Sequence, residues 1–414
     1  MNERRPSTTD GSRRRPLLAL EGSILLAATG NAAALVLLPW IVLDLTGSAA
    51  DAGLVAAATA VPLLVASLVS GAVVDRIGRR RTAVASDLAS AVSFAAIPVA
   101  SATVGLSVGL MVVLAVVGAV FDPAGVTAKD SMVPGAARAA GRSLDEDNGW
   151  HEATWGVAFL AGPGLAGVLI ATLGATSAVW VVAGAFVAAA VAIAACDVDE
   201  PEVSRPGPGG LRADIATGIR LVAADRLLRF LAVTNAALAA VYLPVTGVLL
   251  PARFEDLGQP GRLGVLLATI SAGAVVGSLG SSVLVRRLGR QRAYRLSLAG
   301  SAAALAAMAL AFEASWPLLL AGGFALGIAF GPVQPSVNVA IQTRSDEQHR
   351  GRVTGLLIAS EYAGGPIGFL AAGAVADAVG VTPTFVGATI VLVIVAAVAA
   401  VAPAAAELDD LDGG

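Results

Sequence analysis

The sequence predicts an all-α membrane protein of twelve transmembrane helices, arranged as two similar bundles of six. Three observations predict this fold: apolar runs of spanning length, basic residues that gather on one side of these runs, and landmarks that recur in the second half. Of the 414 residues, 56% are hydrophobic and 14% are charged, whereas soluble proteins carry about a quarter charged residues. The composition therefore excludes a soluble enzyme and makes the lipid bilayer the expected surrounding.

A helix needs about 20 residues to cross a hydrocarbon core of about 30 Å. Six segments in the first half meet this length, namely Leu20–Leu43, Gly53–Val74, Thr82–Ala102, Leu106–Gly125, Ala153–Leu173 and Ser177–Ala195. Six follow in the second half, namely Leu227–Leu250, Leu263–Val285, Tyr294–Phe312, Trp316–Ile341, Val353–Ala376 and Thr382–Val401. The expected organisation is an N-terminal tail (1–19), a first bundle (20–196), a central loop (197–226), a second bundle (227–403) and an acidic tail (404–414).

The basic residues predict the orientation of these spans. Twenty-five of the 27 fall in segments on one side, and only Arg253 and Arg262 fall on the other. Cytoplasmic loops of membrane proteins carry an excess of Lys and Arg. Both termini are therefore expected in the cytoplasm, with the protein in the inner membrane of a bacterium.

The central loop is acidic and then rich in Pro and Gly, as linkers are. After it, Leu211, Ile215, Ile219 and Val222 recur at helical spacing, which predicts an amphipathic helix on the cytoplasmic surface; a solvated connector is an equal alternative. The chain ends on an acidic stretch from Pro403, which is expected to be disordered.

Landmarks of the first half recur in the second at offsets of about 200 residues. The pattern Gly118-x-x-Phe121-x-Pro123 returns at Gly327, Phe330 and Pro332, and Gly162-Pro163 returns at Gly365-Pro366. Two repeated six-helix halves are the architecture of transporters whose site lies between the halves.

The connection between the second and third spans reads Gly71-x-x-x-Asp75-Arg76-x-Gly78-Arg79-Arg80. It resembles the loop signature of the major facilitator superfamily, and with the twelve spans and the repeat this resemblance covers the whole chain. The nearest subgroup resembles the bacterial drug, macrolide and siderophore exporters. The stretch Ala161–Gly167 is similar to the antiporter motif of such exporters, through Gly162, Pro163 and Gly167; close helix packing is the alternative interpretation.

The resemblance implies that the halves rock about a shared cavity, and it implies a role for the signature loop. The counterpart of Asp75 meets the start of span 11, near Val353 in this chain, and latches the cytoplasmic side. Two departures matter. Span 4 has no arginine, and Asn31 stands where many members carry an acid, so proton coupling must use another residue.

Acids inside a membrane are costly and are functional by default. The three candidates for proton coupling are Asp122 in span 4, followed by Glu361 in span 11 and Glu21 at the start of span 1. A simple interface acid is the alternative for each of them. Asp44 and Asp377 lie at outer ends of spans, where water reaches them, and carry no predicted role.

The expected wall of the substrate cavity combines uncharged polar and aromatic residues. These are Asn31, Trp40, Phe121, Trp155, Asn235, Tyr242, Phe330, Gln334 and Asn338; ordinary helix packing is the alternative for each. Prolines within the spans are expected to mark kinks or broken segments. These are Pro39, Pro123, Pro163, Pro244, Pro332, Pro335 and Pro366.

No Lys or Arg lies inside a predicted span, which argues against an anionic substrate. The expected function is proton-coupled efflux of an apolar neutral or cationic small molecule. The alternatives are an importer or uniporter on the same fold, and a membrane sensor or scaffold without transport.

The expected partners are the bilayer, the substrate and protons. We expect no nucleic acid, no metal, no cofactor besides the proton gradient, and a monomer.

Overall fold

The structure is a computed structural model that describes residues 10–141, 144–196, 210–312, 315–345 and 347–412. Across these residues twelve helices are long and apolar enough to cross a membrane. The predicted fold class is thereby confirmed in its helix content and number of spans.

The first bundle uses one helix for each span. In chain order these are α1 (Asp10–Thr46), α2 (Ala49–Ile77), α3 (Arg79–Thr103), α4 (Val108–Ala140), α5 (Leu144–Leu173) and α6 (Ala175–Ala194). The fourth helix runs well past Gly125, where the sequence analysis ended its span, and this difference shapes the candidate site below.

Two spans of the second bundle are interrupted. The bundle consists of α8 (Arg226–Pro244), a π turn (Val245–Leu249), α9 (Leu250–Asp256), α10 (Pro260–Leu288), α11 (Arg290–Ala311), α12 (Trp316–Phe330), α13 (Val333–Arg344), α14 (Glu347–Val379) and α15 (Val381–Val401). The breaks follow Pro244 and surround Pro332, two of the seven predicted positions, because proline removes a helical hydrogen bond and crowds the preceding turn. At the other five, Pro39, Pro123, Pro163, Pro335 and Pro366, the helix continues without interruption.

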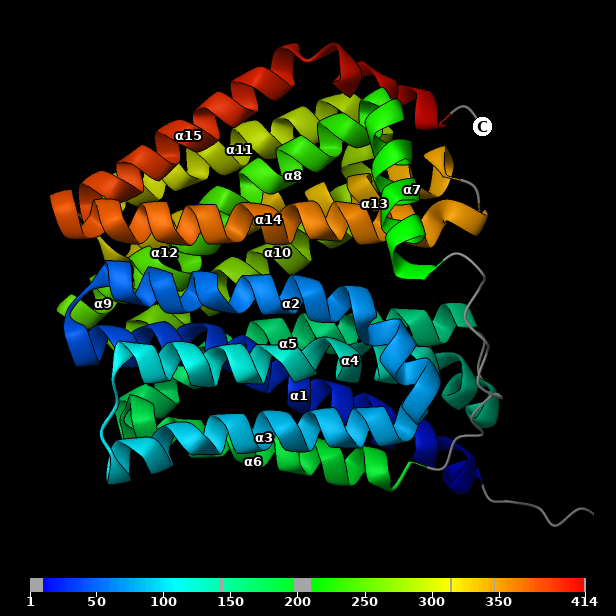
Figure 1. The fold of residues 1–414 in the computed structure, drawn as a ribbon. Helices are drawn as coiled ribbons and strands as arrows, with labels where there is room; N and C mark the ends of the chain where they lie inside the picture. Colours follow the sequence, from blue (N-terminus) through cyan, green and yellow to red (C-terminus); the bar gives the residue numbers. More distant parts are fainter. Residues whose placement is uncertain (1–9, 142–143, 197–209, 313–314, 346, 413–414) are drawn as a thin grey trace, which may run out of the picture.

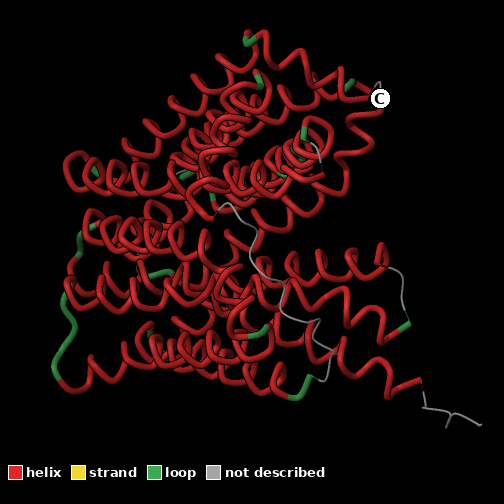
Figure 2. The backbone as a smooth tube through the Cα atoms, turned by 45° about the vertical axis from the view of Figure 1, so that its right-hand side comes forward, coloured by secondary structure: helices red, strands yellow, loops and turns green. Residues whose placement is uncertain are grey.

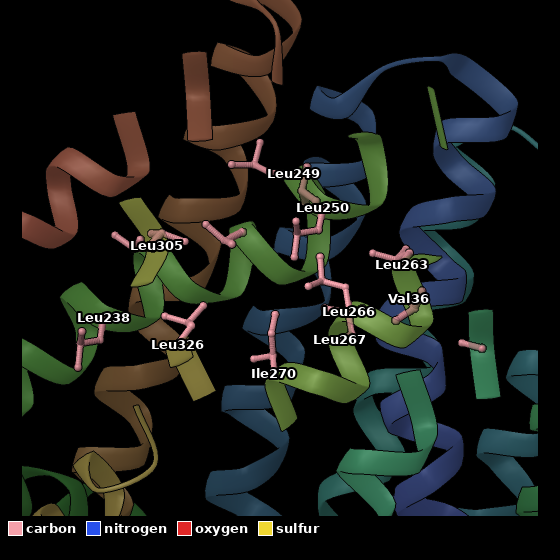
Figure 3. Packing of buried hydrophobic residues seen from close by; sticks show 14 of the residues in the cluster. Val36, Leu238, Leu249, Leu250, Leu263, Leu266, Leu267, Ile270, Leu305 and Leu326 are labelled. Carbon is pink, nitrogen blue, oxygen red and sulfur yellow. The ribbon is translucent and has the colours of Figure 1, made fainter. Parts of the chain in front are cut away.

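The bundles lie side by side, with α2 along α14 and α5 along α10 (Figures 1 and 2). Figure 1 shows both ends of the described chain at one end of the molecule, called here the termini end. The opposite end, where α1 turns into α2, is called the Ser48 end. Figure 3 shows part of the hydrophobic cluster that joins the bundles, in which Val36 of α1 clusters with Leu263, Leu266 and Ile270 of α10.

The segment that connects the two bundles is helical in its second part. The stretch predicted to form an amphipathic helix is α7 (Gly210–Ala224), with Val222 buried and Ile219 half exposed; the linker 197–209 lies outside the described residues.

The expectation of a disordered tail is wrong, because residues Pro403–Asp412 form a 3₁₀ helix, η2. Ala405, Leu408 and Leu411 are buried in it, and their spacing of three places them on one face of a helix with three residues per turn. Asp409 further accepts a hydrogen bond from the backbone N–H of Gln291, at 2.8 Å. The packed face outweighs the acidic composition that predicted disorder.

Candidate functional site

Lys129, the single lysine of the chain, is buried inside the first bundle. It lies on α4, is 3% exposed, and its Nζ donates a hydrogen bond to Oδ1 of Asp87 on α3 at 2.8 Å. Lys129 lies beyond Gly125, where the predicted fourth span ends, so it counts among the basic residues expected on the cytoplasmic side. In the structure it lies within the candidate span Val108–Ala140, so the expectation that no basic residue lies inside a span is wrong. The ion pair explains the error, because a charge is tolerated among apolar helices when it is paired, and α4 therefore continues through it.

A close approach of α3 and α4 makes this pair possible. A Cβ at Gly125 would collide with the side chain of Ser86, and the Ser86 hydroxyl donates to the carbonyl oxygen of Phe121 at 2.6 Å. Ser86 and Asp87 are neighbours in α3, and Lys129 lies one turn beyond Gly125 in α4. The small residue thus brings the carboxylate within reach of the ammonium group.

Asp122, the first predicted proton carrier, lies on the same face of α4 as Gly125 and Lys129. It is partly buried, and Nδ2 of Asn31 on α1 donates to its Oδ1 at 2.7 Å. The prediction had placed Asn31 in the substrate cavity and Asp122 in proton coupling. The structure joins the two in one contact between α1 and α4.

These groups surround one small pocket in the first bundle. Its lining includes three carboxylates, Asp87, Asp122 and Asp130, the ammonium group of Lys129, the amide of Asn31 and the indole of Trp155. We call this set the charged pocket. With all four ionisable groups charged, it holds two more negative charges than positive charges.

A histidine lies beside the charged pocket, towards the termini end. His151 on α5 places Nδ1 at 3.3 Å from Glu21 Oε1 of α1 and Nε2 at 3.4 Å from Asp130 Oδ1 of α4. Hydrogen bonds to Asp130 and then Glu21 raise the pKa of His151 to about 10, so the imidazole is positively charged at neutral pH. His151 precedes Ala153, where the predicted fifth span begins, so a polar loop is expected there. It lies within a helix instead, because α5 begins at Leu144.

The predicted aromatic wall is divided between the bundles. Tyr242 of α8 and Phe330 of α12 stack with ring centroids 4.6 Å apart and line a second small pocket. Leucine and valine side chains and Ser301 complete its wall. Trp155 and Phe159 also stack, with centroids at 6.0 Å. The first bundle therefore offers charge and the second an apolar, aromatic surface.

The remaining predicted site residues are scattered. Trp40 is 5% exposed within the hydrophobic core and Asn235 is 7% exposed on α8, whereas Phe121 is 41% exposed. Gln334 and Asn338 are exposed on α13, where Nε2 of the first lies 3.5 Å from Oδ1 of the second. Glu361 lies on α14, but its side chain is outside the described residues.

The signature loop is a tight turn between α2 and α3. Gly78 adopts a positive φ of 93° there. Arg79 donates to the Ser131 carbonyl oxygen of α4 at 2.9 Å, and Arg80 donates to the Ala194 carbonyl oxygen at the end of α6. These arginines therefore fasten the turn within the first bundle.

Asp75 and Arg76 lie at the end of α2, just before this turn. Arg76 is exposed and Asp75 is half-buried, whereas the surroundings of Gly71 are not described. Within the described part of the chain, no hydrogen bond or ion pair joins Asp75 to α14. The side chains of residues 347–351, at the start of α14, lie outside the described residues, so the latch stays a prediction.

The antiporter-like motif packs against two partners. A Cβ at Gly162 would lie 2.9 Å from the Thr29 carbonyl oxygen of α1 in the same bundle. One at Gly167 would lie 2.8 Å from Gly264 Cα on α10 of the other bundle. Pro163, between them, is buried. The motif thus occupies the contact between the halves near the Ser48 end.

Comparison with known proteins places this arrangement in a family. The family model described as Major Facilitator Superfamily matches residues 22–252 and 230–408. The chain belongs to the major facilitator superfamily. Members of this superfamily are transporters and not enzymes, so the predicted class of membrane transporter is confirmed.

Curated relatives and solved structures agree with this membership. The chain is 40% identical, over 96% of each chain, to a protein of Mycobacterium tuberculosis named "Multidrug efflux pump Tap". It is 39% identical, over 96% of its length and 98% of the relative, to the protein of the same name from Mycolicibacterium fortuitum. The crystal structure of the nucleoside transporter NupG has a TM-score of 0.74 at 12% identity, covering 93% of this chain and 98% of that chain.

A second solved structure is recorded in a named conformation. A bacterial homologue of the human lysosomal transporter Spinster, described as inward-facing and unoccupied, has a TM-score of 0.73 at 14% identity, covering 98% of this chain and 99% of that chain. At these identities the structures support the fold alone.

Proposed function

We propose that this superfamily member is a proton-coupled exporter of apolar neutral or cationic small molecules from a bacterial cytoplasm, with both termini in the cytoplasm. Export is supported by the name of the relatives that are about 40% identical over nearly the whole chain. Cytoplasmic termini are supported by the arginines that gather at the termini end, including those of the signature loop.

The observation that carries proton coupling is the charged pocket. Each ionised residue at the centre of a membrane helix costs about 2.5–3.5 kcal/mol on insertion scales, yet Asp87, Asp122 and Lys129 line one pocket in an apolar bundle. Lys129 compensates Asp87 through their 2.8 Å contact, and the imidazolium of His151, 3.4 Å from Asp130, compensates the third carboxylate of the lining. Among the described residues, Asp122 is thus the one carboxylate of the pocket without a positive partner. Binding of one proton would make the pocket neutral, and its release would restore one negative charge.

Asp122 is the group that changes its proton in this proposal. Its partner Asn31 is uncharged and can donate its N–H to either form of the carboxyl group, so the contact between α1 and α4 survives protonation. Asp87, in contrast, has the ammonium group of Lys129 beside it, which favours the ionised carboxylate. A change of charge at Asp122 alters the free energy of opening the pocket to either side of the membrane. It can therefore shift the equilibrium between the inward-facing and the outward-facing conformation.

The pocket around Tyr242 and Phe330 supports an apolar substrate, because aromatic rings bury large apolar surfaces without demanding charge. The expectation that the substrate is not an anion no longer rests on the absence of a cation, because Lys129 lies within a span. Its ammonium group is paired with Asp87 and is therefore already neutralised. A cationic substrate remains compatible with the extra carboxylate of the charged pocket.

The test combines resistance with transport. Cells with the gene are expected to survive higher concentrations of some apolar or cationic antibiotics than cells without it. In everted membrane vesicles, an uncoupler should abolish uptake of such a compound, and Asp122→Asn should bring uptake to background at unchanged protein level. Uptake that persists with the uncoupler would indicate facilitated movement and not proton-coupled export. Antibiotic resistance of the cells without any uptake into vesicles would contradict the proposal that the protein transports the compound.

A further inference from the structure

The contact between the bundles that α2 makes with α14 ends in a set of hydrogen bonds at the Ser48 end. Oδ1 of Asp377 on α14 accepts from the N–H of Ala49 at 2.8 Å. Its Oδ2 accepts from the Ser48 hydroxyl at 2.7 Å and from the N–H of Ala50 at 3.2 Å. One carboxylate of the second bundle therefore binds the first turn of a helix of the first bundle.

This contact accounts for the free donors at the start of α2. The first N–H groups of a helix have no partner within the helix. Asp377 takes those of Ala49 and Ala50, and the Ser48 side chain accepts from that of Asp51 at 3.1 Å. Ser48 is thus both the cap of α2 and a donor to the opposite bundle.

The position of Asp377 in its own helix is unfavourable without this partner. It lies two residues before Val379, the last residue of α14, where the negative end of the helix dipole disfavours an acid. At the start of α2 the same charge meets the positive end of a dipole. The contact with α2 offsets the unfavourable interaction of Asp377 with the dipole of its own helix. The carboxylate therefore stabilises the arrangement in which α2 and α14 meet at the Ser48 end.

Backbone packing beside Asp377 strengthens the same closure. A Cβ at Gly373 would lie 2.5 Å from the Ala49 carbonyl oxygen, and a Cβ at Gly53 would meet the Phe369 carbonyl oxygen. The two glycines, one on each helix, let the backbones touch and bring the carboxylate to the first turn of α2.

The other end of α2 carries a matching acid. Asp75 lies two residues before Ile77, the last residue of α2, as Asp377 lies two residues before the last residue of α14. Each helix thus presents an aspartate near its C-terminus at the end where the antiparallel partner begins. Asp377 is engaged with the start of α2 in the structure, and the matching contact of Asp75 with the start of α14 is the predicted latch of the opposite end.

We propose that Asp377 is a gating residue for the transport cycle, which holds the Ser48 end closed by binding the start of α2. In the opposite facing this contact is broken, and the Ser48 end opens. The role rests on the proposed function, since a gate has meaning only in a transporter. Its test measures the opening itself and needs no substrate.

The experiment uses the full chain with Cys196→Ser, reconstituted in lipid nanodiscs without substrate. Spin labels at Leu54→Cys on α2 and Val375→Cys on α14, positions that are 43% and 45% exposed, report the separation of the helices by double electron–electron resonance. Asp377→Asn keeps the shape and removes the charge. We expect it to raise the ratio of the long-distance to the short-distance population about five-fold, the scale of one charge at a helix terminus.

Two further variants complete the design. Ser48→Ala, which removes the hydroxyl that donates to Asp377, should move the populations in the same direction and by less. Asp44→Asn removes an exposed acid of α1 at the same end and should leave them unchanged. Unchanged populations in both Asp377→Asn and Ser48→Ala, or an equal shift in Asp44→Asn, would overturn the gate. A shift in a protein that confers no resistance would keep the gate and reject export.

Discussion

Lys129 shows how one residue changes the character of a span. An ammonium group with 4% of its side chain exposed would be very unfavourable without Asp87, whose side chain is equally buried. Breaking a buried pair by removing one partner costs about 3–5 kcal/mol, because the other charge remains buried and unpaired, whereas removing both can be nearly neutral. The pair therefore acts as one unit in α3 and α4.

This reasoning predicts a strongly coupled double-mutant cycle. Lys129→Met should lower the thermal unfolding temperature in detergent markedly, because it leaves Asp87 without its cation. Adding Asp87→Asn should restore much of the loss, since no buried charge remains. Additive losses in the two single variants and the double variant would show that the ion pair is not the stabilising feature.

His151 connects three helices through two carboxylates, and its pKa determines when this connection is strong. The folded-state pKa is raised from 6.5 to about 10 by Asp130 and Glu21. A group whose pKa is raised by folding stabilises the protein fully below its unfolded pKa and loses that contribution as the pH rises through its folded pKa. The imidazolium thus supports α1, α4 and α5 at neutral pH.

We predict that the stabilisation by His151 is largest below about pH 6.5 and disappears as the pH approaches 10. The measurement is the difference in unfolding temperature between the parent and His151→Gln across the pH range from 6.5 to 10. The difference should shrink steadily over this range. A constant difference would mean that His151 acts through packing and not through its charge.

At the scale of elements, glycines determine where the two bundles touch. The α5–α10 contact brings Gly167 and Gly264 together so closely that a Cβ on Gly167 would lie 2.7 Å from the Pro260 carbonyl oxygen. Backbone atoms cannot move aside as a flexible side chain can. Gly164, one turn earlier on α5, would place its Cβ at 3.6 Å from Ala268 Cβ, an ordinary contact.

We therefore predict different effects for two identical substitutions on α5. Gly167→Ala should separate α5 from α10, at a cost of about 1–3 kcal/mol typical of overpacking, and reduce resistance at normal membrane levels. Gly164→Ala is the matched control and should retain resistance. If both variants retain resistance, or both lose it, close packing at Gly167 does not explain the effect.

Fold and site differ in how far they follow from the sequence. The twelve spans were predictable because span length is set by bilayer thickness, and breaks at Pro244 and Pro332 follow from the chemistry of proline. The charged pocket was predicted only through Asp122, Asn31 and Trp155. Lys129 and His151 were assigned to polar segments because unpaired charges avoid lipid, and their partners lie on helices whose alignment one sequence does not specify.

The tail illustrates the same limit. Its acids suggested disorder, but Ala405, Leu408 and Leu411 pack as the buried face of a 3₁₀ helix. Three apolar residues at a spacing of three were visible in the sequence. What was not visible was the surface of α8 and α11 that covers them. Local pattern predicted the possible face, and tertiary contact decided that it formed.

At the scale of the whole molecule, the charge distribution predicts how the chain lies in the membrane. Arg76 and its neighbours in the signature loop lie at the termini end, whereas Asp44 lies at the Ser48 end. Lys and Arg are retained on the cytoplasmic side, so the Ser48 end should face outward. In that orientation the contact of Asp377 with the start of α2 lies on the outward side.

Cysteine labelling in intact cells tests this orientation. In a Cys196→Ser background, Asp44→Cys should react with a membrane-impermeant maleimide added outside, because its side chain is exposed at the Ser48 end. Arg76→Cys, also exposed, should react only after the membrane is permeabilised. The reverse pattern would place the termini outside. The Asp377 contact would then be a gate on the cytoplasmic side, and import would be the first direction of transport to test.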